Sequence, residues 1–154
     1  MRNDIGTKTY LYPMPGLIIA TYGPDGTPEA MNAAWGGICD ENKIALCLSA
    51  EHKTTKNILD RKAFTVSVAD AAHVDACDYV GIVSGNQVQD KFEKAGFHAV
   101  NSKFVDAPVI EELPMALECR LTGVQVELII AAIANLGADA SDLGDVRNTV
   151  PAKV

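Results

Sequence analysis

The sequence predicts a mainly β fold, an antiparallel barrel into which a few short helices are inserted. Short runs of apolar and β-branched residues recur along the chain, and turn residues separate them. The helical patterns are few and short, so they do not provide a crossover helix between each pair of strands. The sequence has no G-x-G-x-x-G after a strand and no G-x-x-x-x-G-K-[ST], which excludes the usual phosphate loops of α/β folds.

The first half of the chain predicts four strands and one helix. The turn at Pro24-Asp25-Gly26 is typical of a hairpin, because proline fixes φ and glycine accepts positive φ. Apolar residues alternate with others along the third and fourth strands, as in half-buried strands. Residues 54–62 are too polar on one side for a strand and predict a short helix capped by a threonine. The strands are expected over 15–23, within 24–37, over 43–50 and over 63–70.

The second half predicts two helices followed by strands. Residues 71–81 place Val74 and Cys77 on one face at helical spacing and end at Gly81, which we expect to be a C-cap. A second short helix within 87–97 ends at its own glycine, Gly96. The long β-branched segment 115–140 predicts one or two further strands.

Length and charge limit the classes of function. A chain of 154 residues predicts one domain, residues 1–154, which can bury a core unaided. The net charge of −7 argues against affinity for nucleic acid or anionic lipid, because that affinity comes from summed positive charge. The apolar run at 16–20 is too short to span a membrane, and the N-terminus does not resemble a signal peptide, so we expect a cytoplasmic protein.

The four cysteines do not predict a metal or redox site. They lie far apart at Cys39, Cys47, Cys77 and Cys119, and no C-x-x-C is present. Three of them, at 47, 77 and 119, lie in apolar patterns, where a free cysteine behaves as a small hydrophobic residue. We therefore expect reduced thiols in the core and no metal ligand.

The stretch "SAEHKTTKNILD", residues 49–60, concentrates basic and hydroxyl side chains in an acidic chain. A helix that begins here presents free N–H groups and the positive end of its dipole, to which Lys53 and Lys56 add charge. Such a start could hold a phosphate. A helix cap with two solvated lysines explains the same residues, so this stretch alone leaves both interpretations open.

Two further stretches are compatible with a flat ligand. In "AMNAAWGGICD", residues 30–40, small residues flank the only tryptophan, as close approach of the backbone to a planar group requires. The segment "YVGIVSGNQVQDKF", residues 79–92, contains a Gly/Ser loop that leads to Lys91. A core tryptophan beside a Gly-Gly bend, and a surface loop capped at Ser84, are the structural alternatives.

Taken together, these motifs resemble the flavin reductase-like FMN-binding split-barrel family, most closely its flavoredoxin branch. The matching segments are "MNAAWGGIC", Ser49 with "KTTKNI", "AFTVSV", and "YVGIVSGNQVQDKF" before "VDAPVIEELPMALECRL". Each motif is weak by itself, but four in this order are fairly specific. The resemblance covers about residues 5–128.

The resemblance implies a six-stranded antiparallel split barrel that forms a homodimer, with FMN at the dimer interface. It implies that the flavin carries the chemistry, so no protein side chain is expected to be a catalytic acid or base. It also implies NAD(P)H or a protein redox partner as electron source or acceptor. The residues implied at the isoalloxazine ring are Asn32, Ala33, Ala34 and Trp35. Those implied at the phosphate are Ser49, Lys53, Thr54 and Thr55, with Val68 and Ala69 bordering the cofactor and Ser84, Gly85 and Lys91 closing the site.

The C-terminal segment leaves the function open at this point. Members of the family continue to a glycine-spaced, aromatic C-terminal segment, whereas this sequence ends in "ASDLGDVRNTVPAKV". We therefore expect the C-terminal part of the domain to be incomplete, with residues missing at Leu128–Ile129 and Gly144–Asp145. An FMN-dependent oxidoreductase is the first hypothesis, and a non-catalytic FMN-binding split-barrel module is the alternative. A structural barrel that binds nothing is a third reading, and an activity like that of pyridoxamine-phosphate oxidases rests on fold analogy alone.

Overall fold

The structure, a computed structural model, describes residues 4, 6–125 and 128–138. Its main sheet has seven strands in the order β2-β1-β5-β8-β9-β4-β3, and all neighbours are antiparallel. A small second sheet pairs β6 with β7. The strands are β1 (Leu17–Tyr22), β2 (Pro28–Ala33), β3 (Gly36–Asp40), β4 (Lys43–Cys47), β5 (Ala63–Val68), β6 (Ala99–Asn101), β7 (Pro108–Ile110), β8 (Met115–Gln125) and β9 (Leu128–Ala138). The helices are α1 (Lys53–Arg61), α2 (Val74–Ile82) and α3 (Lys91–Lys94).

Strands β2 and β3 are two parts of one bent strand, since only Ala34 and Trp35 separate them. β2 pairs with β1 at one edge of the sheet, and β3 pairs with β4 at the other edge. The described strands therefore curl into an open barrel that has six strands when the bent strand is counted once. The predicted mainly β split barrel with short inserted helices is confirmed.

Two hydrophobic clusters hold the fold together, one on each face of β1. Leu17 and Ile19 belong to the first cluster, with Phe64 and Val66 of β5. Ile18 and Ala20 point to the second cluster, which includes residues of α2 and α3. Strand β5 was expected to be half-buried, but all six of its residues are buried. It lies in the interior of the sheet, where both faces are covered.

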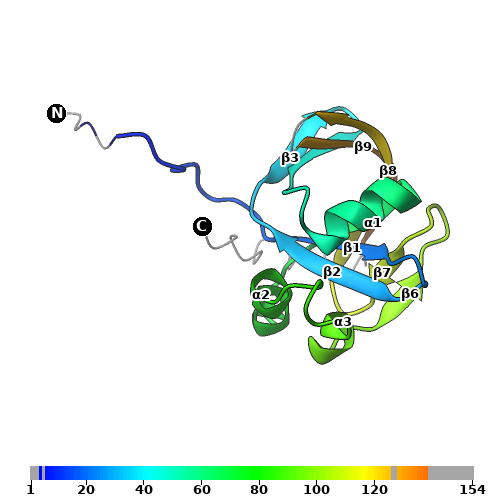
Figure 1. Cartoon of the computed structure of the whole chain (residues 1–154). Helices are drawn as coiled ribbons and strands as arrows, with labels where there is room; N and C mark the ends of the chain where they lie inside the picture. Colours follow the sequence, from blue (N-terminus) through cyan, green and yellow to red (C-terminus); the bar gives the residue numbers. More distant parts are fainter. Residues whose placement is uncertain (1–3, 5, 126–127, 139–154) are drawn as a thin grey trace.

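The helices cover different parts of the barrel (Figure 1). α1 lies across the sheet and contacts mainly β1, whereas α2 and α3 pack on β2. The prediction that α2 ends at a glycine cap is wrong, because α2 continues through Gly81 to Ile82 and is followed by Val83 in extended conformation. Gly96, with φ +81°, follows the C-cap residue of α3 and ends this helical segment, as predicted.

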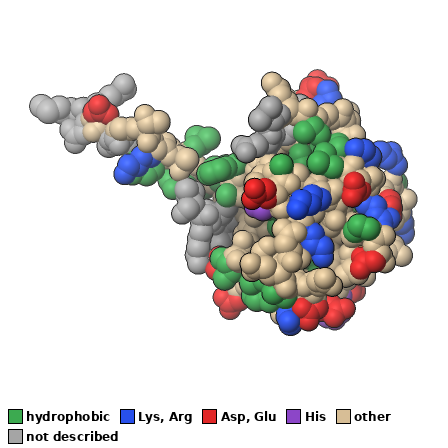
Figure 2. All heavy atoms as spheres, viewed as in Figure 1, with side chains coloured by type: hydrophobic (Ala, Val, Ile, Leu, Met, Phe, Trp, Pro, Cys, Tyr) green, Lys and Arg blue, Asp and Glu red, His purple; other side chains and the backbone are tan. Residues whose placement is uncertain are grey.

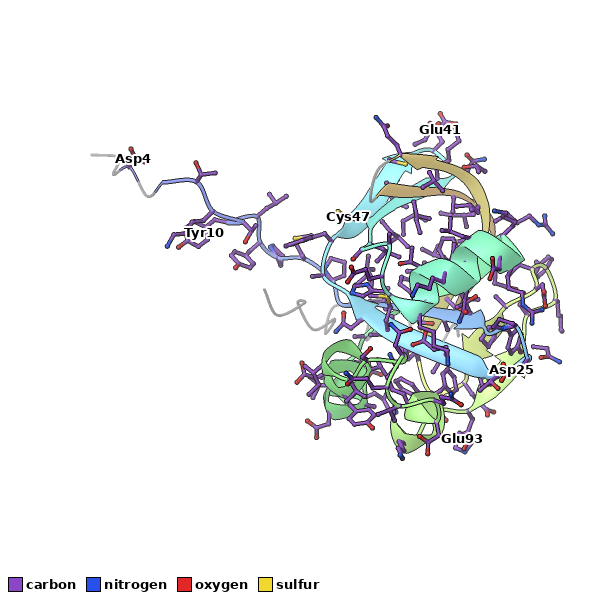
Figure 3. The ribbon with its side chains drawn as sticks, in the orientation of Figure 1. Asp4, Tyr10, Asp25, Glu41, Cys47 and Glu93 are labelled. Carbon is purple, nitrogen blue, oxygen red and sulfur yellow. The ribbon has the colours of Figure 1, made fainter. Side chains whose placement is uncertain are left out.

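The cysteines are divided between the core and the surface. Cys77 and Cys119 are buried, and all four thiols are free. Cys47 is exposed, contrary to the prediction, because it lies on the outward face of β4 (Figure 3). Burial raises the pKa of both Cys77 and Cys119 to about 12. These two thiols therefore stay protonated at neutral pH and are not reactive thiolates.

The predicted C-terminal segment forms two strands, because β8 and β9 pair as neighbours from Met115↔Ala138 to Gln125↔Leu128. The expected missing residues at Gly144–Asp145 lie outside the described residues, and those at Leu128–Ile129 stay a prediction.

At the other end, residues 6–14 form an extended arm that projects away from the barrel (Figure 1). Among the described residues, no helix has the length and apolar character needed to cross a membrane.

Candidate functional site

A cleft of about 300 Å³ lies between the start of α1, the end of α2, strand β2 and the loop before α3. Its volume is at the lower end of the range of small-molecule sites. Four separate segments of the chain therefore meet at this one place. Six of the thirteen predicted site residues line the cleft: Asn32, Lys53, Thr54, Ser84, Gly85 and Lys91.

The start of α1 gives the cleft a positive end. The helix begins at Lys53, and its N-cap residue, His52, makes no side-chain capping bond within the described residues. The first-turn N–H groups of a helix have no partner in the helix itself, and the helix dipole adds partial positive charge there. Both His52 and Lys53 line the cleft. This arrangement suits a phosphate or another small anion.

The two threonines of α1 do not cap it, contrary to the prediction. Thr54 and Thr55 lie inside the first turn and are buried. The Thr54 hydroxyl donates to the Glu29 carboxylate, and the Thr55 hydroxyl donates to the Ser49 carbonyl at 2.7 Å. Since each hydroxyl has one proton, both protons are already used within the protein. These residues can offer an anion their backbone N–H groups.

A buried ion pair forms the floor of the cleft. The Lys91 ammonium lies 2.8 Å from Glu29 Oε1, and the two side chains are 3% and 2% exposed. Lys91 also donates to the carbonyl of Val80 at 3.3 Å. Both residues line the cleft, so a carboxylate lies at the same end as the cations.

Two glycines allow the walls of the cleft to approach each other. A Cβ on Gly81 would lie 3.0 Å from Asn32 Cβ, so this glycine lets α2 pack closely on β2. A Cβ on Gly85 would lie 2.5 Å from Glu29 Oε1, which is closer than real Cβ atoms come. The loop is also tied to the start of α1, because Asn86 Nδ2 donates to the Glu51 carbonyl at 3.1 Å.

Asn32 offers a hydrogen-bonding atom that the protein does not use. Its side-chain amide donates to the Cys77 carbonyl at 3.3 Å. Its Oδ1 is buried and has no partner among the described residues. Most buried polar atoms are hydrogen-bonded, so a free acceptor that lines a cleft is typical of a ligand site.

The other seven predicted residues do not line the cleft. Ala33, Ala34 and Trp35 continue from Asn32 into the bend, and Trp35 is 46% exposed, which excludes its placement in the core. Thr55 lies in the first turn of α1, and its hydroxyl donates to the carbonyl of Ser49, which precedes the helix. Val68 and Ala69 are buried at the end of β5, and Val68 pairs with Leu17, the partner of Ala33.

Several residues that line the cleft carry no signal in the sequence. Glu29 and Met31 lie on β2, and Gly81 to Val83 lie at the end of α2. A glutamate in a short strand after a hairpin turn has the pattern of a surface residue, so its burial gave no signal in the sequence. His52, within the basic stretch 49–60, also lines the cleft. Among the described residues, no group of three or more potential metal ligands is present.

The structure is an open antiparallel split barrel with a cleft whose end, at the start of α1, suits an anion and which holds an unused acceptor. The family model described as "Flavin reductase like domain" matches residues 9–149. The chain belongs to this family.

Solved structures and a curated relative are similar to this chain. Flavoredoxin of Desulfovibrio vulgaris (Miyazaki F) is 37% identical, with a TM-score of 0.88, over 99% of this chain and 83% of that one. An FMN-binding domain of a flavin reductases-like enzyme from Shewanella baltica OS155 is 23% identical over 81% of this chain and 69% of that one. Its TM-score of 0.76 shows the shared fold. An uncharacterized protein of Aquifex aeolicus is 28% identical over 71% of this chain, and the match spans 59% of that protein.

Proposed function

We propose that the protein binds FMN in this cleft and acts as an oxidoreductase of the flavoredoxin or flavin reductase type. The cleft carries the proposal, because it brings a helix start, Lys53 and the free acceptor of Asn32 together from distant segments. Family membership and the likeness to a flavoredoxin support it. When bound, FMN would supply the hydride or electron transfer.

The residues of the cleft fit the parts of FMN. The N–H groups of α1 and the Lys53 ammonium suit a phosphate. Asn32 Oδ1 can accept a hydrogen bond from an N–H or O–H of the flavin. The bend at Ala34 and Trp35 begins two residues further on, and its small and aromatic side chains would suit contact with the ring. Val68 and Ala69, buried at the end of β5, would border the cofactor from the other side of β1.

We also propose NAD(P)H or a protein redox partner as the electron partner, and a homodimer as the working form. The dimer is supported by exposed apolar side chains on the arm and on β3, where Ile38 is 66% exposed. A non-catalytic FMN-binding module is the alternative, because the features of the cleft that suit FMN would bind it equally well in a protein that transfers no electrons.

The decisive experiment is the visible absorption spectrum after incubation with FMN and gel filtration. Retention of about one flavin per chain would support the cofactor assignment. Flavin-dependent oxidation of NADH or NADPH, or reduction of the bound flavin by a redox protein, would then distinguish the oxidoreductase from the binding module. A protein that elutes without flavin at saturating FMN would contradict the proposal.

A further inference from the structure

Glu29 occupies an unusual position for a carboxylate. It lies at the end of the cleft where the α1 start and two lysines favour an anion, yet it carries a negative charge itself. Its side chain is 2% exposed. A buried carboxylate is costly unless it is paired and hydrogen-bonded, so its surroundings must compensate the charge.

Each carboxylate oxygen of Glu29 has its own partner. Oε1 is paired with Lys91 of α3, and Oε2 accepts the hydroxyl proton of Thr54 in α1. Lys91 reaches further to the Val80 carbonyl in α2, and Gly85 leaves room for Oε1. One side chain of β2 therefore connects every element that borders the anion-binding end of the cleft.

The pairing also determines the charge of that end. Glu29 neutralises Lys91, which leaves Lys53 and the dipole of α1 for a ligand. We propose that Glu29 is a positioning residue that sets the charge of the cleft through Lys91, and thereby sets how strongly the cleft selects a phosphorylated flavin over an unphosphorylated one. This inference rests on the proposed function.

A comparison of FMN with riboflavin separates this role from a merely structural one. The two flavins differ only by the phosphate, so a loss of cleft shape weakens both, whereas a change of charge acts on FMN alone. A unit charge within several ångströms of a partly buried phosphate changes its binding by about tenfold or more. The ratio of the two dissociation constants, riboflavin over FMN, is therefore the quantity to measure.

The experiment uses the full chain with Glu29→Gln, Lys91→Met and the double variant. We expect Glu29→Gln to raise the ratio at least about tenfold, because the Lys91 charge is then uncompensated. Lys91→Met should lower the ratio by a similar factor, because the Glu29 charge then opposes the phosphate. The double variant should return to within about threefold of the wild type, since the net charge is restored.

Thermal unfolding without flavin provides a second, independent readout. Each single substitution leaves one buried charge unpaired and should lower Tm by roughly 10 °C, whereas the double variant should recover much of this loss. If one single variant does not fold, the other single variant still tests the ratio, because each changes the charge beside the phosphate in one direction. The double variant tests whether the two charges compensate each other.

An unchanged ratio in each single variant that binds riboflavin would overturn the inference, and so would additive losses of Tm. Failure of the wild type to bind FMN at all would instead contradict the proposed function. In that case the unfolding cycle still decides whether Glu29 and Lys91 act as one unit.

Discussion

At the scale of residues, the two lysines of the cleft differ in their partners. Lys91 is buried in its ion pair with Glu29. Lys53 forms no ion pair among the described residues, although it lines the same cleft. Lys53 is therefore the cation that can respond to a ligand, and Lys91 the one that holds the floor of the cleft in place.

Lys53→Ala should weaken FMN binding by about 1.5–3 kcal/mol, because it removes one charged hydrogen-bond donor from the phosphate. Flavin fluorescence titration measures the effect. Lys56→Ala is the matched control, since Lys56 is exposed on the same helix and does not line the cleft. Equal losses in both variants would indicate long-range attraction and not a contact.

Gly85→Ala should destabilise the protein by about 1–3 kcal/mol, because the new Cβ would lie 2.5 Å from Glu29 Oε1. Moving the loop away from Glu29 should also weaken FMN binding. Gly37→Ala is the control, since nothing lies within 4 Å of its Cβ position. Urea unfolding of both variants measures the difference, and an unaffected Gly85→Ala would show that the loop adapts without cost.

Part of this site could be predicted from the sequence. The remaining residues take their roles from burial in the folded chain, which the sequence does not show. Lys53 was predicted from the basic stretch at the helix start, and the family resemblance implied Asn32 and Gly85; all three line the cleft. Glu29 could not be predicted, because the sequence does not show that two helices and a loop will bury a strand carboxylate. The threonine hydroxyls were assigned to a ligand for the same reason, since their acceptors become visible only in the folded chain.

At the scale of elements, local patterns predicted the strands well and the helix ends poorly. Alternation in β4 places Ile44 and Leu46 inside, as expected. Gly81 has the sequence pattern of a cap, yet it serves close packing of α2 on β2. The end of α1 carries no glycine, and Lys62 adopts the left-handed conformation there, with φ 60°.

Lys62→Gly should therefore stabilise the protein by up to about 1 kcal/mol, because glycine adopts this conformation without the steric cost of a Cβ. The exposed Lys56, inside α1, provides the matched control. Lys56→Gly should destabilise the protein by about 1 kcal/mol, the usual cost of glycine in a helix interior. A lower Tm in Lys62→Gly would contradict this. It would mean that contacts of the Lys62 side chain stabilise the protein by more than the left-handed backbone conformation at this residue costs.

At the scale of the whole molecule, the order of the strands could not be derived from the sequence. β1 pairs with β5, and β4 pairs with β9, across long stretches of chain. Periodicity shows which residues face inward but not which strands become neighbours. The resemblance supplied the split barrel, and the bend at Ala34–Trp35 explains why seven strand segments correspond to six strands.

The outer surface of the molecule also has a feature that a single chain does not explain. Tyr10, Leu11 and Tyr12 are 55%, 74% and 58% exposed on an arm that leaves the barrel, and Figure 3 shows Tyr10 far from the core. Figure 2 shows hydrophobic side chains along this arm and beside its attachment. Ile38 on the edge strand β3 adds a further exposed apolar side chain. Exposed apolar surface of this kind is typical of an interface.

If these surfaces form the proposed homodimer, the wild type should have twice the chain mass of 16.4 kDa in light scattering. Ile38→Lys should give a monomer, because it places a charge in the interface and leaves the core unchanged. Val100→Lys, on β6 of the small sheet and 47% exposed, is the control and should remain dimeric. Loss of FMN from the Ile38→Lys monomer would show that the site needs both copies. A wild-type monomer that retains FMN would contradict the dimer and assign the whole site to one chain.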